Sequence, residues 1–204
     1  MTPDFSLLTT MNYLALGDSY TIGEGVPFEE NFPSQTVSLL KRKEIVVKYF
    51  QVIAKTGWTT DELASAIEKA SIHPPYDIVS LLIGVNNQYR GRSLENYQQE
   101  FESLLKKSIE FAGKDVSNVY VLSIPDWGVT PFAEGRDRSK IAQEIDAFNG
   151  INKKISAQYK VNYINITPST REAASDPTLL TGDKLHPSGK EYGKWARMVS
   201  EVIR

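Results

Sequence analysis

The chain has 204 residues, of which 41% are hydrophobic and 24% are charged, and its net charge at pH 7 is −2. This length fits one α/β domain, so we expect a single domain over residues 1–204. The near-neutral charge and the lack of basic blocks argue against nucleic acid as a partner. Cysteine is absent, which excludes disulfides, thiolate zinc sites and a cysteine nucleophile.

Targeting and membrane signals are also weak. No apolar run approaches the roughly 20 residues that a membrane-spanning helix needs, so we expect no integral membrane segment. The N-terminus has an early acid, Asp4, and no basic region, unlike a signal peptide. We therefore expect a cytoplasmic protein, or a periplasmic or secreted one if a signal was removed. The oligomeric state has no signature in the sequence.

Apolar, β-branched runs alternate with segments of helical periodicity along the chain. In chain order they predict strand 12–16, helix 33–42, strand 45–54, helix 61–71, strand 77–83, helix 94–111, strand 118–124, a helix somewhere within 138–158, strand 162–166 and helix 188–203. Such alternation is typical of a parallel sheet covered by helices on both sides.

Local signals refine these elements. Thr59 and Glu62 have the spacing of a capping box, and Gly113 is a stop signal for the helix before it. Asn149 and Gly150 weaken the middle of the helix expected at 138–158. The connections 125–137 and 167–187 are long for a compact domain, which predicts that they are functional or mobile.

Polar residues follow the ends of the predicted strands. Ligands of open parallel sheets bind outside the carboxyl ends of the strands, so these residues are expected at one edge. The segments are Gly17-Asp18-Ser19, Lys55-Thr56-Gly57-Trp58, Gly84-Val85-Asn86-Asn87, Pro125-Asp126-Trp127-Gly128 and, in the last long connection, Asp183-Lys184-Leu185-His186.

Ser19 is either a turn residue or a nucleophile, and a serine nucleophile needs an adjacent base. His73 precedes the third strand, at the opposite edge, which leaves His186. An isolated His186 before Pro187 is more often a helix-start residue, but Asp183 lies three residues earlier, close enough to orient an imidazole. Taken by itself, Asp183 is equally well explained as the first residue of an Asx turn.

An oxyanion formed at Ser19 needs donors placed in advance. The backbone N–H of Ser19, the N–H of Gly57 and the side-chain amide of Asn86 are the candidates. Taken singly, Gly57 is more often an ordinary strand-to-helix turn and Asn86 an Asx-turn residue.

Together these residues resemble the SGNH (GDSL-type) hydrolases, a family of serine esterases and lipases. The matching blocks, in order, carry Ser19, Gly57, Asn86 and the Asp183/His186 pair. The resemblance implies a flavodoxin-like, three-layer α/β/α fold with a five-stranded parallel sheet. It implies a Ser19–His186–Asp183 triad, an oxyanion hole of Ser19, Gly57 and Asn86, and no metal or cofactor. One departure is Asn87, which stands where the family commonly has Asp.

The expected activity is hydrolysis of a small-molecule carboxylic ester with a short to medium acyl group, of the lysophospholipase, thioesterase or acyl-sugar esterase type. Acyl transfer at the same site and a non-catalytic, flavodoxin-like binding module are the alternatives. The binding module leaves the pairing of Asp183 with His186 unexplained. Residues in the loops at this edge are expected to contact the substrate: Trp58, Asn87, Tyr89, Arg90 and Trp127, with Phe132 as a further candidate.

Overall fold

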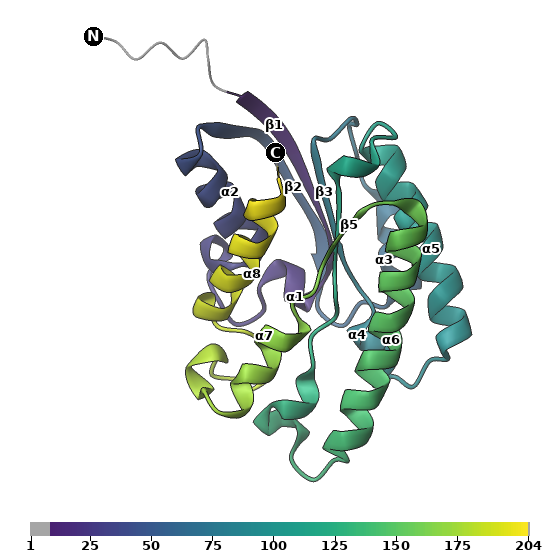
Figure 1. The fold of residues 1–204 in the computed structure, drawn as a ribbon, viewed down its shortest axis with the longest axis vertical. Helices are drawn as coiled ribbons and strands as arrows, with labels where there is room; N and C mark the ends of the chain where they lie inside the picture. The colour runs from purple at the N-terminus through teal and green to yellow at the C-terminus, as the bar shows by residue number, and fades with distance from the viewer. Residues whose placement is uncertain (1–8, 204) are drawn as a thin grey trace.

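Five parallel strands form the central sheet of the computed structural model, which describes residues 9–203 (Figure 1). Their order in the sheet is β2-β1-β3-β4-β5, and every neighbouring pair is parallel. This is the order of flavodoxin-like doubly wound sheets, so the predicted fold class is confirmed. Residues 1–8 and 204 of the expected domain lie outside the described residues. The strands are β1 (Thr9–Asp18), β2 (Ile45–Lys55), β3 (Ile78–Leu82), β4 (Val119–Leu122) and β5 (Asn162–Ile164).

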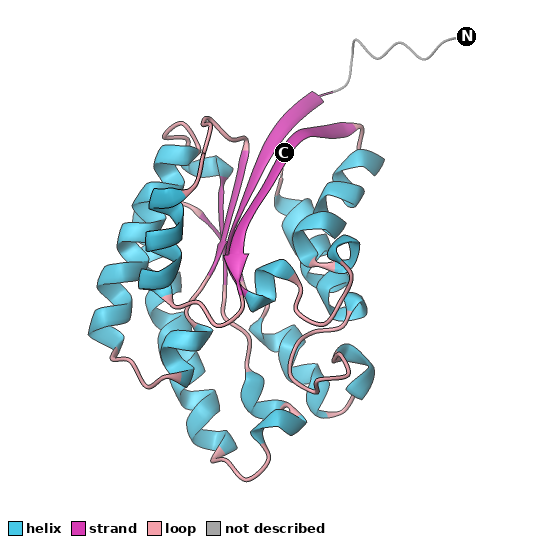
Figure 2. Ribbon diagram, turned by 180° about the vertical axis from the view of Figure 1, so that it is seen from behind, coloured by secondary structure: helices cyan, strands magenta, loops and turns pink. Residues whose placement is uncertain are grey.

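Helices cover both faces of the sheet (Figures 1 and 2). One face carries α2 (Phe32–Arg42) and α8 (Gly189–Val202). The other carries α3 (Thr60–Lys69), α5 (Leu94–Phe111) and α6 (Arg138–Tyr159). Three short helices lie at the carboxyl edge of the sheet: α1 (Ser19–Ile22), α4 (Val85–Tyr89) and α7 (Thr167–Arg171). Within residues 9–203, no helix has the length and apolar character needed to cross a membrane.

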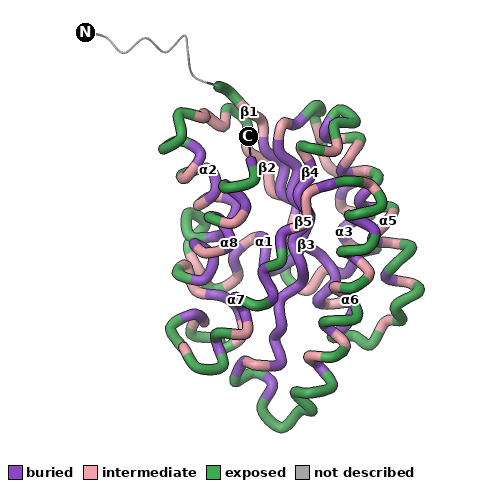
Figure 3. The backbone as a smooth tube through the Cα atoms, in the orientation of Figure 1, coloured by how far each residue is buried: buried purple, intermediate pink, exposed green. Residues whose placement is uncertain are grey.

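The middle of the sheet is the core of the molecule (Figure 3). Every residue of β3 and β4 is buried, as are the last six residues of β1. Burial on both faces explains why these strands read as continuous apolar runs rather than alternating ones. Because the strands are packed on both sides, the loops that leave their carboxyl ends start from fixed positions.

Element boundaries agree with the sequence pattern within a few residues, and α5 begins and ends as predicted. The capping box is confirmed, since the Glu62 carboxylate accepts the Thr59 backbone N–H at 2.9 Å. Gly113 follows the cap of α5 with φ of +64°, as a stop residue should.

Helix α6 runs without interruption from Arg138 to Tyr159, through the Asn149-Gly150 pair that was expected to weaken its middle. The Asn149 side chain accepts the Ile124 N–H at 2.8 Å and donates to the Ile124 carbonyl at 3.1 Å. These bonds satisfy the backbone just beyond β4, and such tertiary contacts outweigh helix propensity.

The two long connections are ordered by short helical turns. The connection after β4 contains η4 (Trp127–Val129) and η5 (Pro131–Ala133). The connection after β5 contains α7, η6 (Glu172–Ala174) and η7 (Pro177–Leu179). Both connections contribute residues to the same edge of the sheet.

Candidate active site

Ser19 lies at the turn between β1 and α1. Asp18 ends the strand and caps the helix, because its carboxylate accepts the Tyr20 N–H at 3.0 Å. Gly17 permits this tight turn, since a Cβ there would lie 2.0 Å from the Thr21 hydroxyl and 2.5 Å from the Leu82 carbonyl oxygen. As the first residue of α1, Ser19 has a backbone N–H with no partner within its helix. The turn therefore presents both the hydroxyl and the N–H at the carboxyl edge of the sheet.

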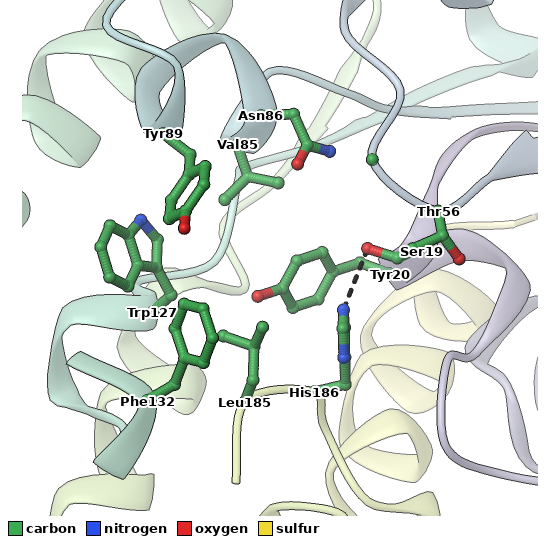
Figure 4. A pocket seen from close by; sticks show the side chains of 11 residues that line it. Ser19, Tyr20, Thr56, Val85, Asn86, Tyr89, Trp127, Phe132, Leu185 and His186 are labelled. Atoms are coloured by element: carbon green, nitrogen blue, oxygen red, sulfur yellow. Dashed lines mark hydrogen bonds between the residues drawn. The ribbon is translucent and has the colours of Figure 1, made fainter. Parts of the chain in front are cut away.

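Asp183 and His186 lie in the loop before α8. One Asp183 oxygen accepts the backbone N–H groups of Leu185 at 2.9 Å and His186 at 3.0 Å, and the Thr181 hydroxyl at 2.7 Å. The other oxygen lies 2.6 Å from His186 Nδ1. His186 Nε2 lies 3.1 Å from Ser19 Oγ (Figure 4). The structure thus brings the three predicted catalytic residues into one chain of hydrogen bonds.

The two carboxyl groups of the site have opposite environments. Partial burial acts to raise the pKa of Asp183, but the hydrogen bonds from His186, Thr181 and the backbone outweigh it and lower the pKa to about 2. Asp183 is therefore ionised at neutral pH. Burial raises the pKa of Asp18 to about 7, against the opposing effect of donors from Tyr20 and Asn86.

Gly57 and Asn86, the residues predicted to supply oxyanion donors, line the same cavity as Ser19. Gly57 has φ of +82°, in the left-handed region that favours glycine. Its carbonyl accepts from Arg90 Nη2 at 2.6 Å, which fixes the orientation of the loop. The Asn86 amide nitrogen donates to the Trp58 carbonyl at 2.9 Å and lies 3.4 Å from Asp18 Oδ2.

A cavity of about 170 Å³ opens beside these groups. Its polar end is formed by Ser19, His186 and Asn86, and its far end by aromatic and aliphatic side chains (Figure 4). At the far end the rings of Tyr89, Trp127 and Phe132 pack against one another. The Arg136 guanidinium lies within 6.0 Å of each ring centroid. The full lining is Ser19, Tyr20, Thr56, Gly57, Val85, Asn86, Tyr89, Trp127, Phe132, Leu185 and His186.

Tyr89, Trp127 and Phe132 line this cavity as expected, but three predicted substrate contacts do not. Asn87 is buried and bonds through its amide to the backbone and hydroxyl of Thr60, at 3.1 and 2.6 Å. Arg90 points to the Gly57 carbonyl and forms an ion pair with Glu62 at 3.3 Å.

Trp58 packs against the hydrophobic core and faces the site only with its backbone carbonyl. These three residues therefore support the loops of the site rather than its cavity. His73 is exposed in the loop before β3, away from the carboxyl edge, where the sequence pattern placed it.

Four residues of the cavity wall were not predicted from the sequence. Each is the immediate neighbour of a predicted residue: Tyr20 of Ser19, Thr56 of Gly57, Val85 of Asn86 and Leu185 of His186. Adjacency to a reactive residue was the available signal for them. Within residues 9–203, no group of three or more His, Cys, Asp or Glu side chains is arranged to hold a metal ion.

Comparison with models of known protein families finds one that matches most of the chain. A family model described as the GDSL-like Lipase/Acylhydrolase family matches residues 15–193. No protein of curated function matches the chain significantly.

Several solved structures share the fold. The acetylxylan esterase Axe2 from Geobacillus stearothermophilus has a TM-score of 0.72 and 19% identity, over 97% of this chain and 95% of that one. The psychrotrophic esterase EstA from Pseudoalteromonas sp., in a structure inhibited by monoethylphosphonate, has a TM-score of 0.67 and 18% identity, over 94% and 96%. A lipase/acylhydrolase from Enterococcus faecalis has a TM-score of 0.67 and 17% identity, over 94% of both chains.

Proposed function

Because the chain belongs to the GDSL-like lipase/acylhydrolase family and is a serine esterase, we propose that Ser19, His186 and Asp183 hydrolyse a carboxylic ester through an acyl-enzyme. The observation that carries this proposal is the chain of hydrogen bonds from Asp183 through His186 to Ser19, at 2.6 and 3.1 Å. A serine hydroxyl becomes an effective nucleophile when such a base is within hydrogen-bond reach.

In the first step, Ser19 Oγ attacks the ester carbonyl while His186 Nε2 takes the hydroxyl proton. Asp183 accepts a hydrogen bond from the His186 Nδ1–H, which keeps the proton on Nδ1 and leaves Nε2 free as a base. Because Asp183 is ionised at neutral pH, it also stabilises the imidazolium that forms. His186 then gives the proton to the departing alkoxide oxygen.

The negative charge that develops on the carbonyl oxygen is stabilised by the N–H groups of Ser19 and Gly57 and the amide of Asn86. Arg90 supports this arrangement through the Gly57 carbonyl. In the second step, His186 deprotonates a water molecule, which attacks the acyl-enzyme and releases the acid. The protonated His186 returns its proton to Ser19, and the enzyme is restored.

The cavity limits the group that fits beside Ser19. Its volume of about 170 Å³ is small beside the roughly 300–1,000 Å³ of pockets that enclose drug-sized ligands. Its wall is apolar at the far end, with Val85, Trp127, Phe132 and Leu185. We therefore propose esters whose group in this cavity is short to medium in length, rather than long-chain lipids.

The test is hydrolysis of p-nitrophenyl esters from acetate to palmitate by the wild type, Ser19→Ala and Ser65→Ala, the last a control serine exposed on α3. We expect turnover by the wild type and by Ser65→Ala, with a maximum at short to medium chains, and none above background by Ser19→Ala. Equal activity of Ser19→Ala and the wild type would contradict the proposed nucleophile. A maximum at palmitate would contradict the proposed size of the substrate.

A further inference from the structure

The polar side chains of the cavity wall have hydrogen-bond partners, with one exception. The partnered ones are Ser19 with His186, Thr56 with Glu24, Asn86 with the Trp58 carbonyl, Tyr89 with Arg136 and Trp127 with Gln88. The exception is the Tyr20 hydroxyl, which forms no hydrogen bond with any residue in the described part of the chain.

Tyr20 is otherwise firmly placed. It follows Ser19 in α1, only 4% of its surface is exposed, and its ring packs against the His186 imidazole at a centroid distance of 5.0 Å. Its side chain crosses the cavity, and the hydroxyl points toward the end formed by Trp127, Phe132 and Leu185 (Figure 4). The catalytic groups lie at the opposite end of the ring.

A hydroxyl that lines a cavity and has no protein partner is available to donate to a ligand that supplies an acceptor there. Burial raises the pKa of the Tyr20 phenol far above its usual range, so the group keeps its proton and remains a donor. The apolar end of the cavity therefore contains one unused donor at a fixed position.

We propose that the Tyr20 hydroxyl donates a hydrogen bond to an oxygen atom of the substrate group that fills the aromatic end of the cavity. The site then selects esters with an ether, hydroxyl or carbonyl oxygen at that point over all-carbon chains of equal length. This inference rests on the proposed esterase function and adds the chemical class of its substrate.

The test compares wild type with Tyr20→Phe, which removes the hydroxyl and keeps the ring beside His186. Two series of esters are used, p-nitrophenyl hexanoates and pentyl acetates, and in each an ether oxygen replaces one methylene at successive positions. The quantity measured is kcat/KM for the ether ester divided by kcat/KM for the all-carbon ester. This ratio cancels changes that affect both esters equally.

For one position of the oxygen, we expect the ratio to be up to about tenfold higher in the wild type than in Tyr20→Phe, as one hydrogen bond of ordinary strength predicts. Tyr192→Phe is the matched control, because it too removes a tyrosine hydroxyl without a hydrogen-bond partner, and Tyr192 does not line the cavity. Its ratio should equal that of the wild type.

Equal ratios in the wild type and Tyr20→Phe at every position of both series would overturn the inference. If hydrolysis still required Ser19 in that case, the proposed esterase function would stand without it. If the wild type hydrolysed no ester in either series, the proposed function would fail, and the inference with it.

Discussion

Replacing Asp18 by asparagine tests the consequence of burying a carboxyl group directly before the proposed nucleophile. Asp18 is fully buried, and burial raises its pKa from 3.8 to about 7. The unfolded chain loses this proton near the lower value, while the folded chain retains it until near neutrality. Protonated Asp18 therefore contributes to the free energy of unfolding. This contribution is fully present below the pKa of the unfolded chain, 3.8, and is lost as the pH rises through the pKa of the folded chain, about 7.

The size of this loss follows from the two pKa values. Between about pH 5 and about pH 8, a group that titrates at 3.8 when unfolded and about 7 when folded lowers the free energy of unfolding by about 3 kcal/mol. Asparagine keeps an oxygen that accepts the Tyr20 N–H, but it carries no titrating proton. We therefore expect Asp18→Asn to lose about 3 kcal/mol less than the wild type over this range.

Urea unfolding at the two pH values measures the effect, with the free energy obtained by linear extrapolation. The comparison uses the change with pH in each protein, so a constant loss from the altered contact with Asn86 cancels. Ser65→Ala, an exposed substitution on α3 that changes no titratable group, is the control, and its pH dependence should equal that of the wild type. The same pH dependence in Asp18→Asn and the wild type would refute the reasoning.

Three further changes follow from the site and its supports. Asn86→Ala should lower kcat roughly 10²–10³-fold with little change in KM, by loss of an oxyanion donor; steady-state kinetics would contradict this if only KM rose. Gly57→Ala should lower the free energy of unfolding, measured in urea, by about 1 kcal/mol or more, because the φ of Gly57 is +82°. Gly150→Ala, in open space on α6, should raise the free energy of unfolding by about 0.5–1 kcal/mol. A more stable Gly57→Ala variant would refute the argument from φ. Asn149→Ala should lower the free energy of unfolding by about 1–3 kcal/mol, because it leaves the Ile124 N–H without a partner while the Ile124 carbonyl still accepts from the Thr167 hydroxyl, and an unchanged denaturation midpoint would contradict that.

The sheet and the meeting of the site residues could be predicted because both follow from general rules of chain geometry. A buried parallel strand reads as an apolar run, and its carboxyl end marks one edge of the sheet. Ser19, Asn86 and His186 follow different elements, yet these rules place them at the same edge.

The direction of each loop side chain did not follow from the same rules. Asn86 and Asn87 are neighbours on α4, and successive residues of a helix point about 100° apart. One amide therefore faces the cavity, while the other is buried against Thr60. Arg90, a charged residue in a loop at the edge, was predicted to contact substrate, but Glu62 and the Gly57 carbonyl provide its partners. Only the packed structure decides between such alternatives.

Covalent labelling tests the central claim, that Ser19 is the nucleophile activated by His186, most directly. The wild type is treated with a p-nitrophenyl dialkyl phosphate, which transfers its phosphoryl group to an activated serine, and the labelled peptide is located by mass spectrometry. We expect one label per chain, on Ser19, at a rate that falls sharply in His186→Ala. A label on another residue of the active enzyme, or full hydrolytic activity after Ser19 is blocked, would contradict the account.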